Sequence, residues 1–266
     1  SDGFRAVILC GIMDELLKSE YVAILVSSDD KDSTSQLDRI HSLIDRRVDG
    51  VILYPELDTR SDEYLKEVWD RGIPLTTTDR LMAQTHADFV GTDDVMGGRL
   101  AAELLLGMGH RRLAHLAGPE SVTTASDRKA GFDKAVEAVS DASVVTLHTV
   151  WEGDPSALPE LLGGEDRPTA IFCDSDMMAV GVYAAARELG LTIPDDLSVI
   201  GYGDLLVSKG LLPPLTTVKQ SPYDIGRRAA RQVLDRIDKK CVTEEPFRLR
   251  FEPELIIRSS TCAVRD

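Results

Sequence analysis

Short apolar runs that end at turn-forming residues alternate with longer amphipathic stretches along the chain. Runs that are hydrophobic at consecutive positions are typical of parallel strands covered by helices on both faces. The predicted strands are 21–27, 48–54, 73–78, 87–91, 113–117, 144–150, 170–173 and 197–201. The predicted helices are 35–46, 63–71, 97–108, 128–139, 177–189 and 224–238. This repeated unit predicts an α/β protein with two doubly wound parallel-sheet lobes rather than one large sheet.

The N-terminal region departs from this order. Residues 4–21 predict a helix followed by a strand, because apolar side chains recur at helical spacing from Val7 to Leu16. A doubly wound lobe ordinarily begins with a strand ahead of that helix. Either this strand lies upstream of Ser1, which we prefer, or residues 6–10 form it themselves.

Composition narrows the class of protein. The 266 residues are 43% hydrophobic but only 5% aromatic, which suits an aliphatic core in one large or two medium domains. The chain has 45 acidic and 30 basic residues, and the resulting net charge of −15 disfavours binding to nucleic acid or to anionic membranes. No apolar run approaches the roughly 20 residues of a membrane helix, and no export signal is recognised.

The spacing of the cysteines indicates a reducing compartment. Cys10, Cys173, Cys241 and Cys262 are scattered without a C-x-x-C pair, which argues against a zinc knuckle or a disulfide scaffold. We expect a cytoplasmic protein.

Motifs of catalysis and of cofactor binding are missing from the sequence. It contains no G-x-S-x-G elbow, no phosphate-binding loop, no H-E-x-x-H and no dinucleotide fingerprint after a strand. The five histidines share no metal-ligand spacing and are interpreted as surface or packing residues. We therefore expect neither an enzyme nor a cofactor nor a metal site.

Polar residues follow several of the predicted strands. Asp79-Arg80, Asp174-Ser175-Asp176 and Asp204 each come directly after an apolar run. Ligands of open parallel sheets bind beyond the carboxyl ends of the strands, and these groups suit a hydroxyl-rich ligand. Helix capping is the alternative. It explains Asp176 equally well, but Asp79-Arg80 precedes no obvious helix.

Five segments together resemble the effector-binding core of the lactose/galactose-repressor type of bacterial transcription regulators. Their order and spacing agree over essentially the whole chain. The segments are GTDDVMGGRLAAELLLGMGHRRLAHLAGP (91–119), RKAGF (128–132), CDSDMMAVG (173–181), IPDDLSVIGYGD (193–204) and PPLTTVKQ (213–220).

The resemblance implies a type I periplasmic-binding-protein-like fold. Its two lobes are joined by three crossover segments, expected near Thr92, Ser221 and Pro253. The N-terminal lobe is then 1–92 plus 221–252, and the C-terminal lobe is 93–220 plus 253–266. Family members bind a small effector between the lobes and contact operator DNA through an N-terminal helix-turn-helix, which this chain does not contain.

The family pattern also implies candidate effector-binding residues. Arg128, three positions before Gly131, matches an arginine that hydrogen-bonds the effector, and Ser175 and Gly203 match positions that are usually Asn and Asp. Trp151 follows a strand and either stacks on the effector or packs between the lobes. Together with the strand-end residues, the candidates are Asp2, Phe4, Arg5, Asp79, Arg80, Arg128, Trp151, Ser175, Asp176, Gly203 and Asp204.

Three departures from that pattern bear on the effector. Arg5 stands in place of an aromatic residue, Ser175 in place of an amide, and Gly203 removes a carboxylate. One hypothesis is an anionic effector, such as a sugar or polyol phosphate, contacted by Arg5 and Arg128. The alternative is a neutral sugar, with Arg5 in solvent and Gly203 making room.

The resemblance favours an effector-sensing, homodimeric core that controls operator binding allosterically. Helices 35–46 and 63–71 are expected to form part of the dimer interface through Leu43, Leu65, Val68 and Trp69, although core packing explains these residues equally. A periplasmic sugar-binding protein of a transporter is the alternative function. Within Gly109–Arg112, His110 and Arg111 are interpreted as structural residues at a helix C-terminus.

Overall fold

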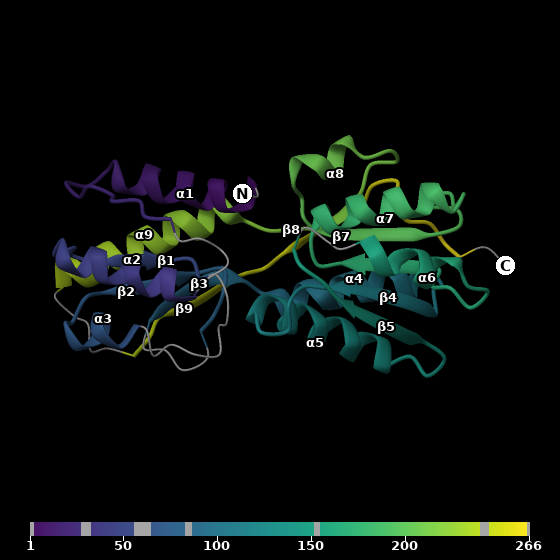
Figure 1. The fold of residues 1–266 in the computed structure, drawn as a ribbon, viewed down its shortest axis with the longest axis horizontal. Coiled ribbons are helices and arrows are strands. Elements are labelled where there is room, and N and C mark those ends of the chain that lie inside the picture. The colour runs from purple at the N-terminus through teal and green to yellow at the C-terminus, as the bar shows by residue number, and fades with distance from the viewer. Residues whose placement is uncertain are drawn as a thin grey trace. The chain divides into compact units, whose positions relative to one another are not determined.

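The chain folds into two compact units (Figure 1). The computed structural model describes residues 3–27, 33–55, 65–82, 87–151, 155–239 and 245–264. The first unit comprises Ser1–Thr92, Ser121–Thr124 and Ser221–Phe251, and the second comprises Asp93–Glu120, Ala125–Gln220 and Glu252–Asp266. The short stretch Ser121–Thr124 thus belongs to the first unit, although the sequence assigned it to the C-terminal lobe.

The second unit is built on a six-stranded sheet in the order β10-β8-β7-β6-β4-β5. Its strands are parallel except for the antiparallel pairing of β10 with β8. The strand bounds are β4 Arg112–Ala117, β5 Ser143–His148, β6 Ala170–Cys173, β7 Ser198–Gly203, β8 Thr216–Lys219 and β10 Glu254–Ile256.

Helices cover both faces of this sheet. Alternate side chains of a strand point to opposite faces, so Leu116 packs with α6 (Leu158–Gly163) and α7 (Asp176–Glu188), whereas Leu113 packs with α4 (Asp94–Gly107) and α5 (Thr123–Glu137). The short helices η2 (Pro155–Ala157) and α8 (Leu206–Gly210) complete the unit. The two-sided burial explains why the strands are apolar at consecutive positions.

The first unit contains a smaller parallel sheet in the order β1-β2-β3-β9. Its strands are β1 Val51–Leu53, β2 Leu75–Thr78, β3 Asp88–Thr92 and β9 Arg248–Phe251. Helix α9 (Pro222–Lys239) contacts β1, β2 and β3, and α1 (Gly3–Leu16) packs on α9. That packing requires glycine, because a Cβ on Gly11 would lie 2.1 Å from the Tyr223 carbonyl oxygen.

A second cluster in the first unit joins α2 (Ser33–Asp45) and α3 (Lys66–Asp70) to the sheet strands. Leu65 and Val68 are fully buried in it. Of the two interpretations of these side chains, core packing is therefore confirmed and a dimer contact is wrong.

The predicted strand at 21–27 does not form. Among the described residues no strand pairs with this segment, and Val22 and Leu25 are 88% and 73% exposed. An isolated apolar run lacks the neighbouring backbone that a strand needs for its hydrogen bonds. Residues 6–10 lie inside α1, so the alternative that they form the first strand is also wrong.

Candidate functional site

Arg128 anchors a cluster at the carboxyl end of the second unit's sheet. Its side chain is almost completely buried, and Nε donates to Asp94 Oδ1 at 2.8 Å. The guanidinium group also lies 3.8 Å from the centre of the Tyr202 ring, whose hydroxyl donates to the same Asp94 oxygen at 2.8 Å. Burial and the neighbouring Asp94 charge raise the pKa of Tyr202, so the phenol stays a hydrogen-bond donor.

Trp151 lies beside this cluster. The Arg128 guanidinium carbon is 5.5 Å from its ring centre, and a Cβ on Gly118 would come within 2.8 Å of the indole. The Ser175 hydroxyl donates to the Trp151 carbonyl at 3.0 Å and accepts from the Met178 amide at 3.2 Å. Ser175 is thus the N-cap of α7, and Trp151 packs within the second unit.

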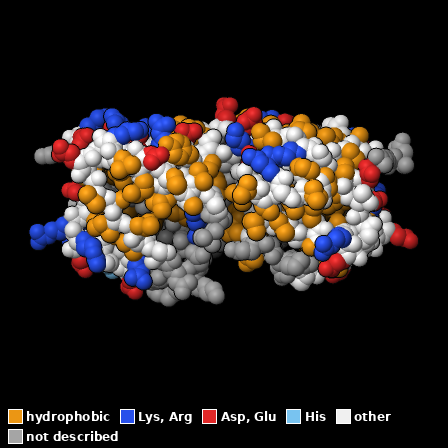
Figure 2. All heavy atoms as spheres, turned by 90° about the horizontal axis from the view of Figure 1, so that it is seen from above, with side chains coloured by type: hydrophobic (Ala, Val, Ile, Leu, Met, Phe, Trp, Pro, Cys, Tyr) orange, Lys and Arg blue, Asp and Glu red, His pale blue; other side chains and the backbone are white. Residues whose placement is uncertain are grey.

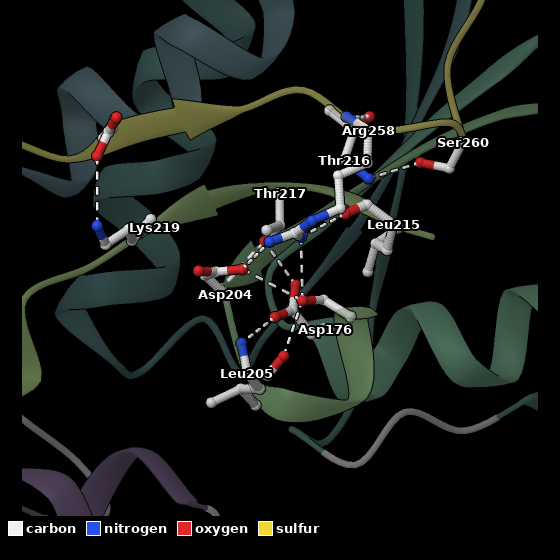
Figure 3. A network of polar contacts seen from close by, with 11 residues as sticks. Asp176, Asp204, Leu205, Leu215, Thr216, Thr217, Lys219, Arg258 and Ser260 are labelled. Atoms are coloured by element: carbon white, nitrogen blue, oxygen red, sulfur yellow. Dashed lines mark hydrogen bonds and ion pairs between the residues drawn. The ribbon is translucent and has the colours of Figure 1, made fainter. Parts of the chain in front are cut away.

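Asp176 is buried one residue further on (Figure 3). Its carboxylate accepts from the Leu205 amide and the Thr217 hydroxyl, each at 2.6 Å, and so joins α7 to the ends of β7 and β8. Burial raises the pKa of Asp176 to about 6, against the opposing effect of these hydrogen bonds. The capping interpretation of Asp176 is wrong, because Ser175 caps the helix and Asp176 turns toward the sheet.

The end of β7 has an unusual backbone. Gly203 and Asp204 have φ angles of +127° and +51°. Glycine adopts such a conformation without strain, which gives a local reason for its presence at position 203. The Asp204 carboxylate is paired with Arg258, as Figure 3 shows, and accepts from the Ser208 hydroxyl at 3.3 Å. Asp204 is thereby held as part of a structural network.

A separate cluster lies in the first unit around Tyr54. The guanidinium carbons of Arg5 and Arg80 lie 4.6 and 5.0 Å from the centre of its ring. The Tyr54 hydroxyl donates to Asp79 Oδ2 at 3.0 Å, and Arg80 Nη1 donates to the Pro55 carbonyl at 3.0 Å. Arg5 is therefore engaged with an aromatic face instead of pointing into solvent.

Asp79 follows β2 with a positive φ of 65°. It is only 5% exposed, and its Oδ1 has no hydrogen-bond partner among the described residues. A buried acceptor of this kind favours a ligand hydroxyl as its partner. Phe4 instead packs in α1 with 8% exposure, and Asp2 lies outside the described residues.

Sequence reasoning missed Tyr54, Asp94 and Tyr202 as members of these clusters. Asp94 follows Asp93, whose side chain caps α4, so in the sequence the two aspartates indicate only the start of a helix. Tyr54 and Tyr202 lie at the carboxyl ends of apolar runs, where the sequence pattern indicates buried core residues. A search for polar atoms at every strand end would have found all three residues.

The histidines serve different local purposes. His110 is hydrogen-bonded in a buried set with Thr169, Ser198 and the Cys262 carbonyl, which confirms its structural interpretation, although its partners are not the last carbonyls of α4. Arg111 does bind the Leu106 carbonyl at the end of that helix, at 3.1 Å.

Within the described ranges, no cluster of His, Cys, Asp or Glu has the form of a metal site, and no helix is long and apolar enough to span a membrane.

Comparison with known proteins identifies the class. The profile of the periplasmic binding protein-like domain matches residues 102–261. The ribose operon repressor of Haemophilus influenzae is 30% identical over 98% of this chain and 78% of its own length. The HTH-type repressor PurR of Mannheimia succiniciproducens is 33% identical over 97% of this chain and 77% of its own length.

Solved structures agree with this class. A LacI family transcriptional regulator from Enterococcus faecium with bound ribose has a TM-score of 0.85 and 29% identity, over 98% of this chain and 95% of that chain. The complex of the regulator CelR with cellobiose has a TM-score of 0.87 and 29% identity, over 97% of this chain and 79% of that chain.

These matches define a periplasmic-binding-protein-like effector domain of two α/β lobes. The chain belongs to the LacI family of transcriptional regulators. It is a regulatory, effector-binding core rather than an enzyme, and its repressor relatives favour this function over that of a transporter's binding protein.

Proposed function

We propose that the chain senses a neutral, hydroxyl-rich effector of the sugar class. The observation that carries this proposal is the buried Arg128–Asp94–Tyr202 cluster beside Trp151, at the sheet edge where open α/β folds bind ligands. An indole offers a flat face for the apolar side of a sugar ring, while carboxylates and guanidinium groups bind its hydroxyls. Relatives with bound ribose and bound cellobiose support the same class.

Charge favours a neutral sugar over a phosphorylated one. Asp94 already compensates Arg128 at 2.8 Å, and the carboxylates of Asp174 and Asp176 lie at the same end of the sheet. In the first unit, Arg5 and Arg80 lie around Tyr54 with the single carboxylate of Asp79, so the charge argument rests on the second unit. There, an added phosphate would meet carboxylates rather than an uncompensated cationic pocket.

We propose a group of effector-binding residues within each unit, taken by itself. Trp151, Arg128 and Ser175 form the group of the second unit, and Arg5, Asp79 and Arg80 form that of the first. Asp176 and Asp204 support the fold around the former group through the contacts in Figure 3, and Gly203 does so through its positive φ angle. Effector binding would alter operator affinity through a DNA-binding headpiece, as in other regulators of this family, and the protein would act in the cytoplasm.

A homodimer is the proposed assembly. Apolar side chains are gathered on the visible surface of each unit in Figure 2. Val7 and Met13 on α1 and Leu17 just after it are exposed, and Leu206 and Leu212 are 86% and 87% exposed at and just after α8. Exposed apolar side chains of this kind suit a two-fold contact. They replace the buried Leu65 and Val68 as the interface candidates.

The effector is tested by thermal shift with ribose, cellobiose and ribose 5-phosphate, together with native mass spectrometry of the purified protein. Stabilisation that rises with concentration of a neutral sugar, and the mass of a dimer, are expected. Trp151→Ala should weaken the apparent affinity about tenfold, as expected when a buried aromatic contact is lost. The exposed Arg99→Ala on α4 is the control.

Two outcomes contradict the proposal. A larger shift with ribose 5-phosphate than with either neutral sugar would restore the anionic effector. If none of the three compounds stabilises the protein, none of them is the effector and the sugar class loses its support. A monomer mass at micromolar concentration would separately contradict the dimer.

A further inference from the structure

A buried imidazole–carboxylate pair lies directly behind the candidate residues of the second unit. His115 and Asp174 are both 0% exposed, and His115 Nε2 donates to Asp174 Oδ1 at 2.9 Å. His115 lies in β4 and pairs in register with Phe172 of the adjacent β6, and Asp174 follows that strand. The pair therefore joins neighbouring strands close to their carboxyl ends.

Packing does not explain the imidazole. The His115 ring stacks on Phe172 with 4.9 Å between centres and tilts against Phe132 at 5.3 Å. A phenylalanine could fill this aromatic layer without burying a ring nitrogen. Instead, His115 Nδ1 has no hydrogen-bond partner among the described residues, which costs free energy. The contribution specific to histidine is the hydrogen bond from Nε2 to Asp174.

Asp174 connects this pair to the candidate site. Its Oδ2 accepts from the Gly118 amide at 2.8 Å, and its backbone carbonyl accepts from Arg128 Nη1 at 2.6 Å. Gly118 is the residue against which the Trp151 indole packs. A shift of Asp174 would therefore displace both the guanidinium group of Arg128 and the support of Trp151.

We propose that His115 and Asp174 are positioning residues that fix Arg128 and Trp151 in their binding geometry. His115 holds the Asp174 carboxylate in the orientation that also binds the Gly118 amide. The importance of this geometry for the effector rests on the proposed function, whereas the positioning itself does not. It can therefore be measured without any effector.

Two substitutions separate the hydrogen bond from the ring packing. His115→Phe keeps an aromatic ring and loses the donor, whereas His115→Gln keeps an amide N–H donor and loses the ring. Both are made in a Trp69→Phe background, so that Trp151 is the one remaining tryptophan of the sequence. The emission maximum of Trp151 and its quenching by acrylamide are measured under conditions in which a urea titration shows that each variant is fully folded.

The proposal expects His115→Phe to shift the Trp151 emission and to increase its quenching, while His115→Gln stays close to the parent protein. Asp174→Asn supplies a second variant. An amide has one oxygen in place of the two carboxylate oxygens that accept from His115 and Gly118, so this variant should shift the Trp151 emission in the same direction. Affinity for ribose should fall about tenfold in His115→Phe, as for a lost hydrogen bond to a charged group.

Unchanged Trp151 emission in His115→Phe and in Asp174→Asn would overturn the positioning role. An equal or larger change in His115→Gln would also overturn it, because ring packing would then be the cause. If the emission changes as expected but ribose does not bind the parent protein, the positioning holds and the ribose form of the proposed function fails.

Discussion

Each unit contains a buried aspartate–arginine pair in direct hydrogen-bond contact, and these two pairs are completed differently. In the first unit, Asp88 accepts from Arg236 Nε at 2.9 Å and from Nη2 at 2.8 Å. Gln232 and the Phe247 amide donate to the same carboxylate at 2.9 and 2.7 Å. In the second unit, Asp94 Oδ1 accepts from Arg128 Nε and from the Tyr202 hydroxyl, each at 2.8 Å.

The position of each pair on the sheet of its own unit explains the difference. Asp88 begins β3 in the first unit's sheet, whereas Asp94 and Arg128 meet Tyr202 near the carboxyl end of β7 in the second unit's sheet. At the amino end, protein donors surround both carboxylate oxygens and join α9 to β3 and β9. At the carboxyl end, Arg128 lies against the rings of Tyr202 and Trp151, where ligands of this fold class bind. The same chemical pair therefore holds the fold in one unit and forms a candidate site in the other.

The largest effect is expected from Arg236→Met. Removing the guanidinium group leaves the buried Asp88 carboxylate without its bidentate partner, and breaking a buried pair in this way costs about 3–5 kcal/mol. The free energy of unfolding is measured by urea titration.

Arg99→Met is the matched control, because Arg99 and Glu103 form an ion pair whose side chains are 47% and 50% exposed. Its loss should change the stability by no more than about 1 kcal/mol. An equal loss of unfolding free energy in Arg236→Met and Arg99→Met would show that burial does not make the Asp88–Arg236 pair more important for stability than the exposed Arg99–Glu103 pair.

A smaller effect is expected where α4 and α5 hold the second pair together. Asp94 lies on α4 and Arg128 on α5, and a Cβ on Gly131 would lie 1.9 Å from the Val95 carbonyl oxygen. Gly131→Ala must therefore push the helices apart, with a cost of about 1–3 kcal/mol in urea unfolding. It should also weaken sugar binding, because it lengthens the contact between Asp94 and Arg128.

Gly107→Ala provides the opposite case on α4. A Cβ on Gly107 would meet no neighbouring atom of the described residues within 4 Å, and the φ angle of this glycine is not positive. Replacing glycine by alanine in a helix then stabilises by up to about 1 kcal/mol. Stabilisation by both substitutions would mean that the close contact of α4 with α5 is not required.

The sequence predicted most of the second unit, because its strands are buried on both faces by helices of the same unit. Every strand predicted from 113 to 201 is found, the one at 170–173 with identical bounds and the others with bounds shifted by one or two residues. The first unit was predicted less well. Residues 21–27 have the composition of a strand, but strand formation depends on a neighbouring backbone that sequence periodicity does not report.

The candidate residues show a similar limit. Arg128, Trp151 and Ser175 were predicted, and the structure brings them into one cluster. The positive φ angles of Asp79 and Asp204 were not predictable, since neither residue is glycine. Whether Ser175 or Asp176 caps α7 depends on which side chain turns toward the sheet, and this is decided by Thr217 and Leu205, far along the chain.

The smallest expected effect is a pH dependence of the unfolding free energy that comes from His110 and Asp176 of the second unit. Burial lowers the pKa of His110 from its usual 6.5, although its hydrogen bond to the Cys262 carbonyl opposes this. The unfolded chain then binds the proton more readily than the folded one, so the stability contributed by neutral His110 is present above pH 6.5 and is lost as the pH falls below it. Asp176 acts in the opposite direction, because its raised pKa of about 6 stabilises the folded state at low pH and that stability is lost as the pH rises from about 4 to about 6.

The two contributions are separated by His110→Gln, which keeps hydrogen-bonding groups but does not titrate. Since Asp176 is common to both proteins, its contribution cancels when urea unfolding of the variant is subtracted from that of the parent protein between pH 8 and pH 5.5. The stability advantage of the parent should shrink below pH 6.5. A difference that stays constant across this range would show that His110 keeps its ordinary pKa in the folded state, and that the polar set at Thr169, Ser198 and Cys262 accepts an imidazolium without penalty.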